Sequence, residues 1–134
     1  MRKLLKSGLA ALFFSTLVVS CAEDNDDDIN FIAEYTGTWD CKENTGINAP
    51  QVYKLSIQRG INDQEIIINN LYNLSGTAVK ANINGFSLTI PQQTSDGVSF
   101  SGSGSAGAEF QEINLNFTAN DGSGDDKVSA VLTR

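Results

Sequence analysis

Few side chains in this sequence could carry out covalent chemistry. The 134 residues include two cysteines, sixteen aspartates and glutamates, and no histidine. The lack of histidine removes the most common general base and the most common metal ligand. Cys41 falls on the predicted inner face of a strand beside Trp39, with no base nearby to activate its thiol. We therefore expect a domain that is not an enzyme.

Two glycine-rich stretches match known binding loops only in part. Residues 102–107 have the G-x-G-x-x-G spacing of dinucleotide-binding loops, but that loop must open a helix, and here a strand is predicted to follow. We interpret this stretch as a flexible hairpin. Residues 120–126 offer Asp121, Asp125 and Asp126 as Ca²⁺ ligands, without the full ligand spacing. No cofactor or metal is predicted, and weak calcium binding at residues 120–126 is the minor alternative.

The first twenty residues have the three parts of a secretory signal. Arg2, Lys3 and Lys6 form a positively charged start, and residues 8–19 form an apolar run. This run is too short for a permanent transmembrane helix. The small residue Ser20 then precedes Cys21. We therefore predict a signal peptide over residues 1–20.

The end of this leader, Val18-Val19-Ser20-Cys21, resembles the lipobox of bacterial lipoproteins. The resemblance implies cleavage before Cys21, a diacylglyceryl group on its thiol and usually an acylated amino end. Each buried CH₂ adds about 0.8 kcal/mol, so two or three chains on one residue anchor a protein durably. We expect Cys21 to hold the protein in a membrane.

Residues 22–28 are almost entirely acidic, and residues 21–34 are predicted to form a lipidated, disordered spacer. An acidic run after the lipidated cysteine is similar to the surface-export signal of some Gram-negative lipoproteins. That resemblance implies the outer face of the outer membrane, with a periplasm-facing anchor as the alternative. An EF-hand is rejected, because Ile29 and Tyr35 stand where the loop needs Gly and Glu.

The mature chain is strongly acidic. The leader removes three of the nine Lys and Arg residues and none of the sixteen acids, which leaves 114 residues with a net side-chain charge of −10. Such a surface repels nucleic acids and anionic lipid headgroups, so no nucleic-acid partner is expected. The length allows one domain, over residues 35–134. No pattern in the sequence indicates its oligomeric state.

From Tyr35 onward, apolar and polar residues alternate with a period of two, and no helical periodicity is sustained. Asn84-Gly85 predicts a hairpin turn with positive φ at both residues, and Pro91 predicts the end of a strand. A single open sheet would leave its apolar face in water. We therefore expect an all-β fold, a small antiparallel up-and-down eight-stranded barrel, with a β-sandwich as the alternative. The predicted inner-face residues are Trp39, Cys41, Tyr53, Leu55, Ile57, Ile66, Ile68, Val79, Ala81, Ile83, Phe86, Leu88, Ile90, Val98, Phe100, Ile113, Leu115, Phe117, Val128, Ala130 and Leu132.

Gly37-Thr38-Trp39, at the start of the first predicted strand, resembles the G-x-W signature of the calycins, the lipocalin and avidin-like barrels. In that group the Trp lies inside the closed end and an Arg from the last strand often packs across it. Arg134 has the parity of Leu132 and could take that place. The resemblance implies a lipocalin-like barrel, and residues 35–134 are also similar to small Gram-negative lipoproteins described as lipocalin-like.

Two kinds of non-catalytic binding follow from these patterns. The barrel could bind a small apolar ligand, with Tyr53, Phe100 and Phe117 as wall residues, although a filled core is favoured by the large inner side chains. Alternatively its loops could contact a host or cell-surface protein or a glycan, for example as an inhibitor of host lysozyme or protease. Leu71 and Tyr72 are the candidate contact residues for that role, and Tyr72 could equally cap the barrel.

Overall fold

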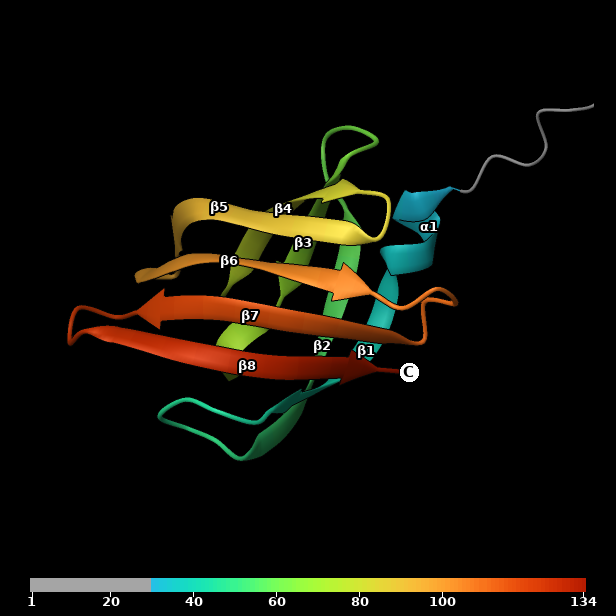
Figure 1. Ribbon diagram of the computed structural model, residues 1–134. Coiled ribbons are helices and arrows are strands. Elements are labelled where there is room, and N and C mark those ends of the chain that lie inside the picture. The colour runs from blue at the N-terminus through green and yellow to red at the C-terminus, as the bar shows by residue number, and fades with distance from the viewer. Residues whose placement is uncertain (1–29) are drawn as a thin grey trace, which may run out of the picture.

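The computed structural model describes residues 30–134 (Figure 1). The predicted signal peptide, Cys21 and residues 22–29 of the spacer lie outside the described residues. The described part begins with a short helix, α1 (Phe31–Tyr35), in which Ile32 and Tyr35 are buried. The side chain of Asn30 caps α1 by accepting a hydrogen bond from the amide of Ala33. Residues 31–34, which were expected to belong to the spacer, therefore pack on the folded domain.

Eight antiparallel strands form one closed up-and-down barrel, as the alternation of apolar residues predicts. Each strand pairs with the next, and β8 pairs with β1 in a register that places Leu132 opposite Cys41. This closure excludes the β-sandwich alternative. The strands are β1 (Gly37–Glu43), β2 (Gln51–Arg59), β3 (Glu65–Asn69), β4 (Ala78–Asn84), β5 (Ser87–Ser95), β6 (Val98–Ala106), β7 (Glu112–Asn120) and β8 (Asp125–Thr133), with a 3₁₀ turn, η3 (Leu71–Asn73), between β3 and β4.

The barrel interior is filled by side chains of alternate residues on every strand. Trp39 and Phe100 have no exposed surface, and Leu55, Ile66 and Leu115 are buried with them. Among residues 30–134, no helix has the length and apolar character needed to cross a membrane.

Local predictions are wrong at three places in the chain. The turn between β4 and β5 consists of Gly85 and Phe86, since Asn84 pairs with Ser87, and only Gly85 of the predicted Asn84-Gly85 pair has a positive φ. Phe86 is consequently 41% exposed and does not continue the inner face. Strand β5 runs through Pro91, because a shift of register between Ile90 and Gln93 accommodates a residue that cannot donate a hydrogen bond.

The third error concerns residues 102–107, predicted to be a flexible hairpin. Gly102 and Gly104 lie inside β6 and pair with Phe117 and Leu115 of β7. A Cβ on Gly102 would lie 2.3 Å from the carbonyl oxygen of Asn116. Glycine is required here because the backbones of β6 and β7 approach closely.

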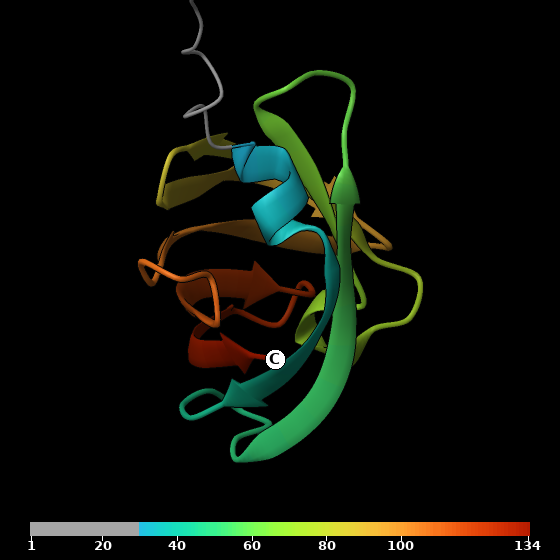
Figure 2. The same ribbon diagram turned by 90° about the vertical axis from the view of Figure 1, so that its right-hand side faces the viewer.

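The connections gather at two ends of the barrel. The β2–β3, β4–β5 and β6–β7 connections lie at the end that α1 covers, which we call the helix end and which faces the viewer in Figure 2. The β1–β2, β3–β4, β5–β6 and β7–β8 connections lie at the opposite end, which we call the mouth. The two ends carry different chemistry.

Candidate functional site

The helix end is closed by Trp39 and Arg134. The indole Nε1 of Trp39 donates a 2.9 Å hydrogen bond to the carbonyl of Tyr35, and the guanidinium carbon of Arg134 lies 3.9 Å from the centroid of the indole ring. The expected packing of Arg134 across Trp39 is confirmed. Gly37 has φ +127°, and a Cβ there would lie 3.5 Å from the guanidinium of Arg134. These three residues therefore build the closed end rather than a binding site.

Hydrogen bonds from Arg134 and Tyr35 complete this closure. The guanidinium donates hydrogen bonds to the carbonyls of Thr36, Phe110 and Glu34. The hydroxyl of Tyr35 donates to the carbonyl of Gly85, and burial raises the pKa of Tyr35 to about 12. The guanidinium of Arg134 and the hydroxyl of Tyr35 therefore both form hydrogen bonds within the domain.

At the mouth, the ring of Tyr72 sits over the end of the barrel. It meets Phe100 and Phe117 edge-on, with ring centroids 6.4 Å and 6.2 Å apart. Its hydroxyl donates a 2.5 Å hydrogen bond to Oδ2 of Asp126 on β8, and its backbone amide donates to the hydroxyl of Tyr53. Tyr72 thus plugs the mouth and holds η3 against strands β2 and β8.

Two buried carboxylates lie beneath this plug. Glu43 has no exposed surface and accepts hydrogen bonds from the hydroxyl of Tyr53 at 2.6 Å and the amide of Gln51 at 2.9 Å. Asp126 is 5% exposed and accepts from the backbone amide of Ile47 as well as from Tyr72. Among residues 30–134 the ion pairs join Lys54 to Asp40 and Arg59 to Asp63, so neither buried carboxylate is balanced by a cation there.

The ionisable groups around these carboxylates stay neutral at ordinary pH. Burial raises the pKa of Tyr53 and of Tyr72, and the acceptor Asp126 raises that of Tyr72 further. Burial also raises the pKa of the Cys41 thiol to about 11, with a further contribution from Glu43. A neutral thiol is a weak nucleophile, and neutral phenols donate hydrogen bonds rather than accept protons. The thiol and the two phenols are therefore hydrogen-bonding groups in their neutral forms.

The backbone is strained at Tyr72. Asn70, Tyr72 and Asn73 all have φ between 58° and 70°, the left-handed region, which asparagine adopts readily but a bulky residue seldom does. At Tyr72 this conformation costs about 1–3 kcal/mol and persists only where surrounding contacts impose it. We call the β3–β4 connection the lid, because it covers the mouth and is held there by the hydrogen bonds of Tyr72.

The predicted site residues are only partly brought together. Of the residues expected as wall residues, Phe100 and Phe117 pack on each other and on Tyr72, and the hydroxyl of Tyr53 accepts from the amide of Tyr72. Tyr72 packs against Phe100 and Phe117 and caps the barrel, which was the alternative interpretation of this residue. Leu71 is fully buried and cannot form a contact surface, because the lid turns its side chain into the core.

The sequence reasoning missed Glu43, and it considered Asp126 only as a calcium ligand in the turn before β8. Both continue an inner-face alternation, Glu43 after Trp39 and Cys41, and Asp126 before Val128. The sequence signal that identifies such a residue is an acid at a position where the alternation predicts an inward-facing side chain.

The clefts of the described residues include two that are lined by none of Tyr53, Tyr72 and Phe100. One, of about 310 Å³, lies along β6, β7 and β8 beside Ser101, Asn116 and Ser129. The other, of about 740 Å³, lies at the helix end.

The acidic turn between β7 and β8 does not assemble a metal site. The carboxylate of Asp121 accepts from Ser123, which lowers its pKa, and Asp125 accepts from Asn120, while Asp126 points into the mouth. Within residues 30–134, no three acidic, cysteine or histidine side chains are grouped so that they could hold a metal ion.

A scan against models of protein families and a search of curated proteins found no match to this chain.

Proposed function

We propose that this chain is a non-catalytic binding protein whose mouth takes a small ligand with an aromatic ring and a positively charged group. The observation that carries the proposal is the placement of Tyr72, whose ring lies against Phe100 and Phe117 while its hydroxyl donates to Asp126. Tyr72 occupies the mouth as a ligand would. A molecule that offers the same ring and a stronger donor can replace it.

The preference for a cation rests on the buried carboxylates. A buried carboxylate is stabilised most by an opposite charge, and Glu43 and Asp126 have only neutral donors among the described residues. An ammonium group placed where the Tyr72 hydroxyl lies would form a charge-assisted hydrogen bond to Asp126.

Displacement of Tyr72 is required because the interior is full. An apolar ligand inside the barrel would need space among Tyr53, Phe100 and Phe117, and these residues are at most 8% exposed. Release of the lid would relieve the left-handed backbone at Tyr72 and so offset part of the lost packing. We therefore propose that ligand entry and lid opening are one event.

The proposed role is binding and not catalysis. The Cys41 thiol and the tyrosine hydroxyls at the mouth remain protonated, so they supply neither a nucleophile nor a base. The carboxylates accept hydrogen bonds from fixed partners. These features support a ligand that is held and released unchanged.

We also propose that Cys21 anchors the domain to the outer membrane, with the domain exposed at the cell surface. The support is the order of charged start, apolar run and Ser20-Cys21 in the sequence. Replacement Cys21→Ser should move the protein from the membrane fraction to the soluble fraction. Degradation of the anchored protein by protease added to intact cells would support the surface, and protection would indicate the periplasmic face.

The packing of Arg134 over Trp39 supports the resemblance to the calycins. That resemblance implies a ligand site at the open end of the barrel, which here is the mouth. The proposed site and the resemblance therefore agree on the end of the barrel, while the cationic preference comes from Glu43 and Asp126 alone.

Three probes of one shape test the proposal: benzylamine, benzyl alcohol and benzoate, titrated into the full chain in detergent and followed by NMR. We expect benzylamine to bind roughly tenfold more tightly than benzoate, a difference of about 1.4 kcal/mol. Asp126→Asn should abolish this preference, and Asp40→Asn, a matched change on the outer surface, should keep it. Equal affinities for the three probes would contradict a cationic site.

A further inference from the structure

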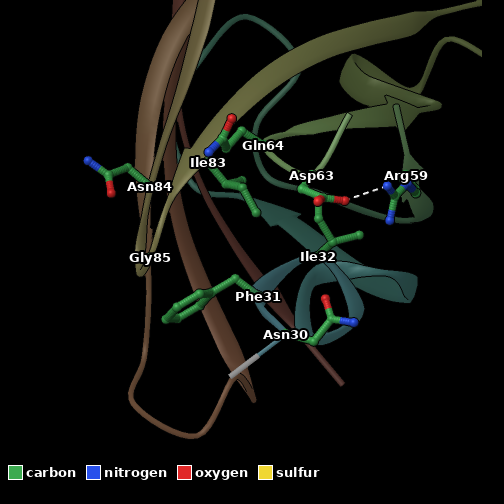
Figure 3. A pocket seen from close by; sticks show the side chains of 9 residues that line it. All are labelled: Asn30, Phe31, Ile32, Arg59, Asp63, Gln64, Ile83, Asn84 and Gly85. Carbon is green, nitrogen blue, oxygen red and sulfur yellow. Dashed lines mark hydrogen bonds and ion pairs between the residues drawn. The ribbon is translucent and has the colours of Figure 1, made fainter. Parts of the chain in front are cut away.

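A cleft of about 740 Å³ lies at the helix end, on the opposite side of the barrel from the mouth (Figure 3). It is bounded by α1, the β2–β3 connection, the end of β4 and the β4–β5 turn. We call it the helix-end cleft. Its volume is that of a small-molecule site. Its lining residues are Asn30, Phe31, Ile32, Arg59, Asp63, Gln64, Ile83, Asn84 and Gly85.

The floor of this cleft is apolar. Ile83 of β4 and Ile32 of α1 point toward its middle, and the ring of Phe31 lies to one side, turned toward Gly85 (Figure 3). Phe86, which is 41% exposed, meets Phe31 edge-on with ring centroids 5.5 Å apart. Two aromatic rings thus stand at one side of the cleft, partly open to solvent.

The rim is polar but carries no net charge. Arg59 and Asp63 pair with each other across the β2–β3 connection, so the two charges cancel. The side-chain amide of Gln64 is exposed and has no hydrogen-bond partner within residues 30–134, whereas the amide of Asn84 points away from the cleft (Figure 3). An amide both donates and accepts, and the ion pair adds strong donors and acceptors.

We propose that the helix-end cleft binds a neutral carbohydrate. A sugar ring has hydroxyl groups that donate and accept around its edge, and apolar C–H faces that pack on aromatic rings. Each part has its counterpart here, in the amide of Gln64 and the ion pair at the rim and in Phe31 at the side of the cleft. An anionic ligand would meet a mature chain of net charge −10 with its nearby arginine already paired, and a purely apolar one would leave the rim groups unsatisfied.

This site is independent of the mouth. It uses none of Glu43, Tyr53, Tyr72 or Asp126, and it lies on the other side of Trp39 and the filled core. Binding of a carbohydrate at the helix end is therefore expected to be unaffected by changes at the mouth. The two proposals can fail separately.

Saturation-transfer NMR on the full chain in detergent tests the proposal, with maltotetraose as a hydroxyl-only probe and chitotetraose as an amide-bearing one. We expect at least one of the two to bind, and Gln64→Ala or Asp63→Ala to weaken that binding roughly fivefold, the effect of one lost hydrogen bond. Both residues are exposed, so neither change should impair folding. Asn114→Ala, which removes an exposed amide from β7, should have no effect.

Two results would overturn the inference. One is the absence of saturation transfer to both sugars. The other is binding that is equally strong in the wild type, Gln64→Ala and Asp63→Ala, since the sugar would then lie elsewhere.

Discussion

The hydroxyl of Tyr72 and the carboxylate of Asp126 are joined by a 2.5 Å hydrogen bond across 54 residues of sequence. This contact ties the β3–β4 lid to the first part of β8 at the mouth of the barrel. It also places a phenol and a buried carboxylate at the proposed ligand site. The stability of the lid and the proposed ligand preference both depend on this pair.

Removal of the Tyr72 hydroxyl should destabilise the protein. Tyr72→Phe keeps the ring between Phe100 and Phe117 and leaves Asp126 with one fewer donor. We expect a loss of about 1–3 kcal/mol in the free energy of unfolding, measured by denaturant titration. The double mutant with Asp126→Asn should lose less than the sum of the two single losses. Strict additivity would show that the hydrogen bond contributes nothing.

All three tyrosines should resist alkaline ionisation while the protein is folded. The pKa of Tyr35 is about 12, and those of Tyr53 and Tyr72 are also raised above the ordinary value of 10. Because the folded-state pKa is the higher one, the stabilisation from these phenols is complete below pH 10 and is lost as pH rises from 10 through the folded-state values. Tyrosinate absorbance should therefore appear together with unfolding. A tyrosine that titrates near pH 10 in the folded protein would contradict the burial of that residue.

Trp39 should be the most costly single residue to truncate at the helix end. Its side chain is fully buried, donates to Tyr35 and lies under Arg134. Trp39→Ala should cost roughly 3–5 kcal/mol, seen as a large fall in the melting temperature. A variant that melts within a few degrees of the parent would show that the barrel closes without this residue.

Gly102 and Gly107 make a matched pair for testing the approach of β6 to β7. A Cβ on Gly102 would lie 2.3 Å from the carbonyl oxygen of Asn116, whereas one on Gly107 would have its nearest neighbour at 3.7 Å. Gly102→Ala should destabilise by about 1–3 kcal/mol and Gly107→Ala by less than about 0.5 kcal/mol. Similar melting temperatures for the two variants would mean that the strands separate easily at Gly102.

The alternation of apolar residues predicts the strands and the closed barrel because each strand has one buried and one exposed face. The same alternation did not reveal Glu43 and Asp126, since apolar character was used to recognise the inner face and an acid there looked like an exception. Helix α1 has only five residues, too few for helical periodicity to appear. Its packing on the barrel depends on Ile32 and Tyr35 meeting distant strands, and no local pattern predicts that.

Turn chemistry predicts connections less well than it predicts strands. Asn84-Gly85 correctly indicates a hairpin between β4 and β5, but cross-strand pairing of Asn84 with Ser87 moves the turn by one residue. Pro91 is tolerated inside β5 because the register shifts there. Both differences arise from the partner strand, which is distant in the sequence from the residues that suggested the turn.

The most direct test of the proposed function is to observe Tyr72 while a ligand binds. The chain has three tyrosines, so the full protein labelled with 3-fluorotyrosine should give three ¹⁹F resonances, assigned by single Tyr→Phe variants. Saturating benzylamine should shift the Tyr72 resonance toward that of a solvent-exposed ring and leave the Tyr35 resonance unchanged. A benzylamine complex in which the Tyr72 resonance does not move would contradict ligand binding by displacement of this side chain.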